Sequence, residues 1–287
     1  MTLAPAATPV ADPDAAALDL LAAAPLVVLT GAGLSTDSGI PDYRGPGRRV
    51  RQPMTIQEFL AHASARQRYW ARSHLGWARM GAAGPNAGHH ALARIDPELL
   101  ITQNVDGLHE AAGSRRVVAL HGRVAEVVCL DCGDVTARTA LQERLEALNP
   151  GWAQRHAQVA SNPDGDVELT ETGGFVVPDC EACGGVVKPH VVFFGENVPK
   201  QRVARCYDAV DGLAGGAGTT GALLVAGSSL TVMSGLRFVR RAAKAGTPVV
   251  IVNRGATRGD DLATYRVHAG CSEFLARLAE RRASLAS

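Results

Sequence analysis

The 287-residue sequence lacks any apolar run long enough to span a bilayer, and it lacks an excess of charge of either sign. Its 29 Lys and Arg residues against 28 Asp and Glu leave a formal net charge of +1. Nucleic-acid and membrane-surface binders normally carry a strong basic excess, so we expect neither kind of partner. The first twenty residues also lack the basic side chains that a signal or transit peptide needs. We therefore expect a cytoplasmic location.

Cysteine is scarce, and four of the six cysteines fall in two C-x-x-C pairs, Cys129/Cys132 and Cys180/Cys183. Without a secretory signal a disulfide framework is not expected. A glycine follows each pair, which suits a tight turn that presents two thiolates. Two such turns predict a tetrahedral four-thiolate zinc site, structural because no coordination position is left for water. The alternative, free cysteines or a redox pair, would be stronger for a single C-x-x-C.

Short runs rich in Val, Ile and Leu predict buried parallel strands, because they are nearly continuous rather than alternating. These runs span residues 26–30, 99–102, 116–120, 222–227 and 248–253. Helical patterns lie between and after them, at residues 14–24, 234–245 and 272–283, the second with Ser234 and Gly246 as its expected caps. The fold class is therefore α/β, with an open, Rossmann-like, doubly wound parallel sheet.

Two long insertions interrupt this alternation, and insertions of this size usually form a smaller domain. We expect a Rossmann-like domain of residues 1–45, 96–122 and 189–287. The smaller helical and zinc-binding domain is then formed by residues 46–95 and 123–188.

The stretch "GAGLSTDSGIPDYRG" directly follows the first strand and is malformed as a dinucleotide fingerprint. The third glycine of G-x-G-x-x-G would fall at Thr36, and the acidic residue expected about 20 residues later is missing. Gly31 and Gly33 still predict a backbone that can approach a phosphate.

Polar or small residues follow five further strands or strand-like runs, which we expect to meet at one edge of one sheet, where such folds bind ligands. They are Gln103, Asn104, Asp106 and His109; His121; the loop of residues 191–199; Ser228 and Ser229; and Asn253. From the residues alone, Asn104 or Asp106 could equally be a helix N-cap, and a histidine at a strand end is as often structural as catalytic.

In combination these motifs resemble the sirtuins, NAD-dependent protein lysine deacylases, over nearly the whole chain. The resemblance rests on eight segments in the family's order: "GAGLSTDSGIPDYRG", "TQNVDGLH", "LHG", "CLDC", "CEAC", "KPHVVFFGENVP", "GSSLTV" and "VN". The stretch "RQRYWARSHLGW" is similar to the branch that contains mitochondrial sirtuins and many bacterial enzymes.

The resemblance implies that NAD, as a cosubstrate, and an acylated lysine of a protein substrate meet in a cleft between the two domains. It assigns His121, Asn104 and Asp106 to catalysis, and Val191, Phe193 and Gly195 to the substrate. The implied cofactor contacts are Gly31, Ala32, Gly33, Ser35, Ile40, Asp42, Tyr43, Arg44, Gln103, Asn104, Val105, Asp106, Gly227, Ser228, Ser229, Asn253, Arg254, Gly255 and Cys271. The acyl oxygen would attack the anomeric carbon of the nicotinamide ribose, and His121 would then serve as the general base for a ribose hydroxyl.

Tyr69 and Arg72 have the Tyr-x-x-Arg spacing by which one sirtuin branch binds succinyl and malonyl groups. On a helix they would share a face and could hold a carboxylate, or Tyr69 could pack and Arg72 pair with a surface acid. Acidic or longer acyl groups could therefore be preferred over acetyl. Three other functions compete: protein mono-ADP-ribosyl transfer, a zinc-ribbon binding module without catalysis, and an NAD-dependent dehydrogenase, which the broken fingerprint disfavours.

Overall fold

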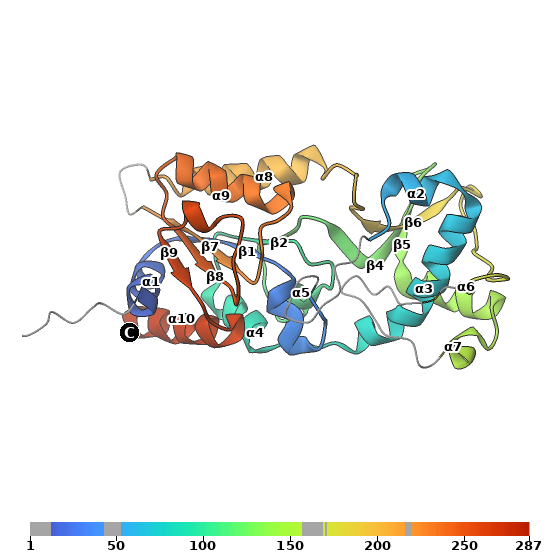
Figure 1. Ribbon diagram of the computed structural model, residues 1–287, viewed down its shortest axis with the longest axis horizontal. Coiled ribbons are helices and arrows are strands. Elements are labelled where there is room, and N and C mark those ends of the chain that lie inside the picture. The colour runs from blue at the N-terminus through green and yellow to red at the C-terminus, as the bar shows by residue number, and fades with distance from the viewer. Residues whose placement is uncertain (1–12, 43–52, 157–168, 170, 216–219, 287) are drawn as a thin grey trace, which may run out of the picture.

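The computed structural model describes residues 13–42, 53–156, 169, 171–215 and 220–286. Its larger sheet has six parallel strands in the order β3-β2-β1-β7-β8-β9 (Figure 1). The strands are β1 (Leu26–Thr30), β2 (Leu99–Thr102), β3 (Val117–Ala119), β7 (Ala222–Ala226), β8 (Val249–Val252) and β9 (Tyr265–Val267). When the six strands are numbered by their order in the chain, they lie in the sheet as 3-2-1-4-5-6, which is the strand order of a Rossmann fold. The direction in which successive strands are added reverses between β1 and β7.

Helices cover both faces of this sheet, which explains why its central strands are apolar without alternation. Leu26 and Val28 point to the face covered by three helices, whereas Val27 and Leu29 point to the face covered by two. The first set is α1 (Pro13–Ala23), α4 (Ala87–Ile95) and α10 (Cys271–Ala286), and the second is α8 (Lys200–Gly212) and α9 (Met233–Lys244) (Figure 1).

A smaller antiparallel sheet has the order β5-β4-β6 and packs with its own helices. Its strands are β4 (Gly122–Cys129), β5 (Val135–Ala137) and β6 (Val187–Val191), and the helices are α2 (Ile56–Ala61), α3 (Ala63–Ala82), α6 (Arg138–Leu148) and α7 (Trp152–Arg155). Trp70 of α3 and Leu145 of α6 are fully buried in the centre of this cluster. A short helix, α5 (Leu108–Ala111), and two 3-10 turns, η1 (Ala32–Ser38) and η2 (Asp260–Leu262), complete the described elements.

The predicted fold class is confirmed, and the predicted strands of the large sheet agree with the structure to within one residue at each end. The expectation that the 191–199 loop lies at the same sheet edge as the others is wrong, because it follows β6 of the smaller sheet. The division into two domains stays a prediction. However, Ala91 and Leu92 of α4 are buried in the core of the large sheet, which favours a boundary before α4 rather than at residue 95.

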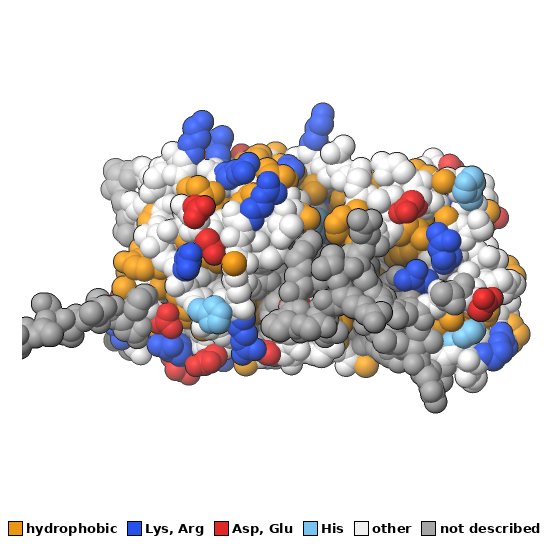
Figure 2. Space-filling model, in the orientation of Figure 1, with side chains coloured by type: hydrophobic (Ala, Val, Ile, Leu, Met, Phe, Trp, Pro, Cys, Tyr) orange, Lys and Arg blue, Asp and Glu red, His pale blue; other side chains and the backbone are white. Residues whose placement is uncertain are grey.

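Basic side chains gather over α8 and α9, along the upper edge of the molecule in Figure 2. The two helices carry seven basic residues and two acidic ones: Lys200, Arg202, Arg205, Arg237, Arg240, Arg241 and Lys244, against Asp208 and Asp211. This face is positive although the whole chain is nearly neutral. Among the described helices, none is long and apolar enough to cross a membrane.

Candidate active site

The glycine loop after β1 lies directly against the loop after β7, at the point where the sheet reverses its winding. The Gly33 N–H donates to the Gly227 carbonyl at 2.8 Å, and the Gly31 N–H to the Ala226 carbonyl at 3.1 Å. A Cβ on Gly31 would lie 2.8 Å from the Gly227 oxygen, and Gly227 has a φ of +68°. These glycines are therefore required for the two loops to approach each other, in addition to any role toward a phosphate.

Ser35, Asn104 and Asp106 form one hydrogen-bonded group between the loops that follow β1 and β2. The buried Ser35 hydroxyl donates to Asp106 Oδ2 at 2.7 Å and accepts from the Asn104 amide at 2.9 Å. The same amide reaches the Gly31 carbonyl at 3.1 Å. Ile40, also buried, follows Ser35 and donates its N–H to the Ser35 carbonyl at 3.3 Å.

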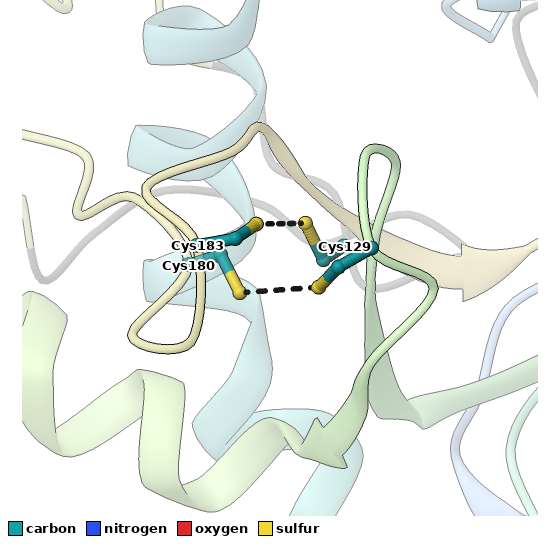
Figure 3. Close-up of side chains that lie close together, drawn as sticks. Cys129, Cys180 and Cys183 are labelled. Carbon is teal, nitrogen blue, oxygen red and sulfur yellow. Dashed lines mark hydrogen bonds between the residues drawn. The ribbon is translucent and has the colours of Figure 1, made fainter.

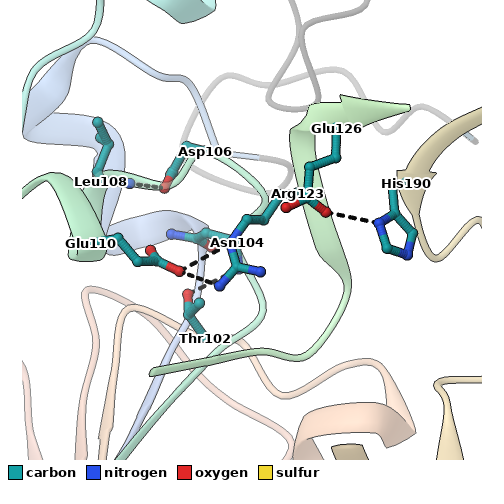
Figure 4. A network of polar contacts seen from close by, with 8 residues as sticks. All are labelled: Thr102, Asn104, Asp106, Leu108, Glu110, Arg123, Glu126 and His190. Carbon is teal, nitrogen blue, oxygen red and sulfur yellow. Dashed lines mark hydrogen bonds and ion pairs between the residues drawn. The ribbon is translucent and has the colours of Figure 1, made fainter. Parts of the chain in front are cut away.

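The alternative that Asn104 or Asp106 is a helix N-cap is wrong, because the N-cap residue of α5 is Gly107 and no described side chain caps this helix. Asp106 instead makes a second hydrogen bond within its own loop. Its second oxygen, Oδ1, accepts the backbone N–H of Leu108 at 3.0 Å, at the first turn of α5 (Figure 4). Nearby, Glu110 of α5 forms a 2.7 Å ion pair with Arg123 of β4, which ties this loop to the smaller sheet (Figure 4). The hydrogen bonds from Leu108 and Ser35 together hold both carboxylate oxygens of Asp106.

His121 is held at both ring nitrogens. Nδ1 lies 2.8 Å from the Gln103 carbonyl, which can only accept, so Nδ1 carries the proton. Nε2 lies 2.8 Å from Ser234 Oγ, at the start of α9. Burial lowers the pKa of His121, the Gln103 carbonyl opposes that shift, and the positive charge of Arg202 adds to it. The ring is thus neutral near pH 7, with the Nε2 lone pair available to a proton donor.

Gly122 brings the end of β6 next to His121. Its φ is +83°, and a Cβ there would lie 2.0 Å from the His190 carbonyl oxygen. The Val192 N–H donates to the His121 carbonyl at 2.7 Å. The predicted substrate residue Val191 therefore lies beside the predicted base, although it belongs to the other sheet.

Tyr69 lies against the predicted substrate residue Phe193, with ring centroids 5.3 Å apart, and Phe59 packs on both. Arg72 lies one turn further along α3 and is partly buried. The predicted substrate residue Gly195 has a φ of +79°, and a Cβ there would lie 2.6 Å from Gln57 Oε1. The structure thus brings Tyr69 and Phe193 together, on elements that are far apart in the sequence.

At the other end of the sheet edge, Asn253 follows β8 and donates its amide to the Gly255 carbonyl at 2.9 Å. Cys271, another predicted cofactor contact, is buried at the start of α10, with Sγ 3.8 Å from the carbonyl of Val252, the residue before Asn253. Arg254 lies over Gly270, where a Cβ would be 2.7 Å from its guanidinium. Burial, with the negative charge of Asp37 adding to it, raises the pKa of Cys271 to about 12. The thiol therefore stays protonated near pH 7, so it acts as a small apolar side chain and not as a nucleophile.

Ser228 and Ser229, the predicted cofactor contacts in the loop after β7, form hydrogen bonds with other residues of the protein. The buried Ser228 hydroxyl donates to Gln103 Oε1 at 2.6 Å, and Ser229 shares a 3.0 Å hydrogen bond with Thr231. The Ser228 hydroxyl therefore helps to position Gln103, and its contact with a ligand stays a prediction. Of the remaining predictions, Ala32 and Val105 lie in the loops already described, and Asp42 ends the described part of the first loop. Tyr43 and Arg44 lie outside the described residues.

The four cysteines predicted to hold a metal lie in one cluster, with all four Sγ atoms within 4.8 Å of one another (Figure 3). Sγ of Cys129 is 3.5 Å from that of Cys183, and Sγ of Cys132 is 3.9 Å from that of Cys180. A tetrahedral zinc ion with Zn–S bonds of about 2.3 Å separates its sulfur ligands by roughly 3.8 Å. The cluster therefore fits a structural zinc.

The two C-x-x-C turns have the same backbone geometry. Gly133 donates its N–H to the Cys129 carbonyl at 3.1 Å, and Gly184 donates to that of Cys180 at 2.9 Å. Both glycines have a φ of +75°. This explains why a glycine follows each pair in the sequence, since the turn requires a left-handed residue there.

Sequence reasoning missed two contributors to this site. Ser234 was assigned to a helix cap, although the structure uses its hydroxyl on His121. Lys188 and Glu196 were seen only as part of a motif, but they form a 3.0 Å ion pair under the 191–196 loop. A lysine five residues before a run of aromatic and glycine residues was the available signal, and it does not specify a partner.

Comparison with known proteins explains why these loops occur together. A family model described as the Sir2 family matches residues 31–234. The chain belongs to the Sir2 family. It is 54% identical over 273 residues to the NAD-dependent protein deacetylase 1 of Mycobacterium avium, covering 93% of this chain and 94% of that protein. It is 55% identical over 271 residues to the NAD-dependent protein deacetylase 1 of Streptomyces coelicolor, covering 92% and 88%.

Solved Sir2 structures share the fold. One of them, a Sir2 protein with a p53 peptide and NAD+, is 31% identical, with a TM-score of 0.70, and the match covers 95% of this chain and 98% of that chain. The resemblance drawn from the motifs is thereby confirmed for this Sir2-family protein. The roles of its individual site residues remain predictions.

Proposed function

We propose that this Sir2-family protein removes acyl groups, acetyl among them, from lysine side chains of protein substrates, and that it consumes NAD in doing so. The products are the free lysine, nicotinamide and O-acyl-ADP-ribose. The observation that carries the proposal is the neutral His121, with Nδ1 on the Gln103 carbonyl and Nε2 directed away from it, beside the Ser35–Asn104–Asp106 group. The relatives named NAD-dependent protein deacetylase support the same reaction.

The residues have separable tasks in this reaction. The Ser35–Asn104–Asp106 group fixes the amide and carboxylate that face the nicotinamide ribose, so that the weakly nucleophilic acyl oxygen is aligned with the ribose carbon that loses nicotinamide. His121 Nε2 then takes the proton of a ribose hydroxyl, which allows that hydroxyl to attack the acyl carbon. The four-cysteine zinc site, which begins at the end of β4, takes no part in these steps.

The substrate side of the site is formed by Val191, Phe193 and Gly195. The Val192 N–H donates a hydrogen bond to the His121 carbonyl. A peptide that binds along residues 191–195 would therefore place its acyl-lysine next to the base. Main-chain recognition of this kind is typical of peptides that add as a strand. We also propose a cytoplasmic location, no nucleic-acid partner, and the cofactor contacts assigned above.

The test is incubation of the protein with NAD and an acetyl-lysine peptide, followed by mass analysis of the products. We expect nicotinamide and O-acetyl-ADP-ribose in equal amounts. His121→Ala should lose product formation by about 10²-fold or more, as expected for removal of a general base. His90→Ala, at an exposed position on α4, is the matched control. Peptide that carries ADP-ribose without loss of its acetyl group would instead indicate mono-ADP-ribosyl transfer.

A further inference from the structure

Ser234 occupies a helix start but does not cap the helix. Serine is favoured at such positions because its hydroxyl can accept a backbone N–H of the first turn. Here α9 begins at Met233, its N-cap residue is Val232, and no side chain caps it. Among the described residues, the one hydrogen bond of the Ser234 hydroxyl goes to His121 Nε2, at 2.8 Å. The prediction that Ser234 is a cap is therefore wrong, and its hydroxyl is committed to the histidine.

The adjacent Gly235 packs against Gln103, the other residue that is hydrogen-bonded to the His121 ring. It is buried, and a Cβ there would lie 2.9 Å from the Gln103 side chain. Gln103 in turn supplies the carbonyl that holds His121 Nδ1. The first turn of α9 thus contacts both His121 and Gln103: Ser234 bonds to the His121 ring, and Gly235 leaves room for the Gln103 side chain.

The chemistry of this arrangement follows from the donors available. Because Nδ1 donates to a carbonyl, the neutral ring offers a lone pair at Nε2, and the hydroxyl of Ser234 donates to it. After the ring has taken up a proton at Nε2, the same hydroxyl can rotate and accept from it. A hydroxyl is therefore suited to both protonation states, whereas a residue that can only donate or only accept would favour one of them.

We propose that Ser234 is a positioning residue for His121, which holds Nε2 in place before a ribose hydroxyl arrives and stabilises the ring after it has taken the proton. This inference rests on the proposed function, because it concerns the base step of that reaction. It predicts that Ser234 serves the acyl-transfer step, which needs His121 as a base, and not the earlier loss of nicotinamide.

Three variants test the proposal: Ser234→Ala, Ser234→Thr, which keeps the hydroxyl, and Ser284→Ala. The Ser284 hydroxyl is exposed on α10, and its one hydrogen bond within the described part of the chain goes to the Glu280 carbonyl of the same helix. Two rates are measured for each with NAD and an acetyl-lysine peptide. One is the exchange of labelled nicotinamide into NAD, which reports the first step. The other is the formation of O-acetyl-ADP-ribose.

We expect Ser234→Ala to lower kcat for O-acetyl-ADP-ribose at least ten-fold, while the exchange rate and the KM for NAD change less than two-fold. Ser234→Thr should restore most of kcat, and Ser284→Ala should behave as wild type. A Ser234→Ala variant with unchanged kcat would overturn the proposal, and so would equal losses in exchange and in product formation.

A readout without substrate separates this proposal from the proposed function. In protein with 15N-labelled histidine, the Nε2 resonance of His121 should move in Ser234→Ala and remain near its wild-type position in Ser234→Thr. If this resonance is unaffected by Ser234→Ala, the hydrogen bond is absent and the proposal fails. If the wild-type protein forms no product although the resonance responds, the proposed function fails while the contact stands.

Discussion

Lys188 and Glu196 join the two ends of the segment predicted to bind the substrate. The buried Lys188 ammonium donates to Glu196 Oε2 at 3.0 Å and to the Val191 carbonyl, and the same Glu196 oxygen accepts the Phe193 N–H at 2.9 Å. The ammonium also lies 4.7 Å from the centre of the Phe193 ring. One ion pair therefore fixes the turn that carries Val191 and Phe193 next to His121.

Lys188→Met should raise the KM for the acyl peptide about ten-fold or more and leave the KM for NAD nearly unchanged, because the unpaired Glu196 and the freed Val191 carbonyl let the segment move. Lys188→Arg should retain most of the peptide affinity, since it preserves the charge and its donors. Steady-state kinetics with the acetyl-lysine peptide measure both constants. Lys200→Met, at an exposed lysine on α8, is the control. Equal KM values for Lys188→Met and wild type would contradict the prediction.

Gly122 should be among the least replaceable residues of the chain. In Gly122→Ala the left-handed φ costs about 1–2 kcal/mol, and the Cβ would collide with the His190 carbonyl 2.0 Å away. We expect at least about 2 kcal/mol of destabilisation, together with loss of activity because β6 must move away from His121. Gly81→Ala provides the contrast, because nothing lies within 4 Å of its Cβ position in α3, and it should stabilise the protein by up to about 1 kcal/mol. Denaturant unfolding of both variants checks the pair.

Zinc should be bound at one ion per chain and should stabilise the smaller sheet without taking part in the reaction. Cys180→Ser should abolish stoichiometric metal content and expose the Trp70 and Trp152 rings, which pack in the same cluster. Cys206→Ala, at a buried cysteine of α8, should keep the metal. Elemental analysis and tryptophan fluorescence give both readouts independently of activity. Full metal content in Cys180→Ser would contradict the assignment.

His109 predicts an acid sensitivity of folding. It is buried, its Nε2 pairs with Thr30, and burial, with the charge of His89 adding to it, lowers its pKa to about 3. The folded protein keeps this ring neutral, whereas the unfolded chain binds a proton below pH 6.5. The contribution to stability is therefore complete above about pH 6.5 and is lost as the pH falls toward 3.

Between pH 7.5 and 5 this single group should remove about 2 kcal/mol from the free energy of unfolding. Burial lowers the pKa of His89 as well, so the whole protein should lose more than that. Urea unfolding at the two pH values measures the loss. His109→Gln should reduce the pH dependence by about 2 kcal/mol. A stability that does not change over this range would refute the prediction.

We predict that acyl preference depends on Tyr69 and Arg72, because Tyr69 contacts the predicted substrate residue Phe193. If the pair holds a carboxylate, rates on succinyl- and glutaryl-lysine peptides should exceed the rate on acetyl-lysine, and Tyr69→Phe with Arg72→Met should reverse that order by ten-fold or more. Arg68→Met, at an exposed position of the same helix, should leave the ratios unchanged. Ratios that are identical in the double variant and in wild type would mean that the pair is structural.

The sequence by itself determined the parts whose cause is local. Short, nearly continuous apolar runs favour strands buried on both faces, and five of the six strands of the large sheet followed from them. Paired cysteines each followed by glycine encode the zinc turns, because the left-handed φ of Gly133 and Gly184 is a property of the turn itself. The ordered series of motifs was specific enough to indicate the family.

Only the tertiary structure decided which side chains act on one another. The bond from Ser234 to His121 spans 113 positions, and the 191–196 loop reaches His121 through a second sheet that strand patterns did not separate from the first. The bond from Ser228 to Gln103 likewise joins loops that are 125 positions apart. Hydrogen bonds between distant loops depend on how the two sheets pack. A hydroxyl can bond equally well to a helix end, to a ligand or to a neighbouring side chain, so the local sequence does not determine which of these partners it takes.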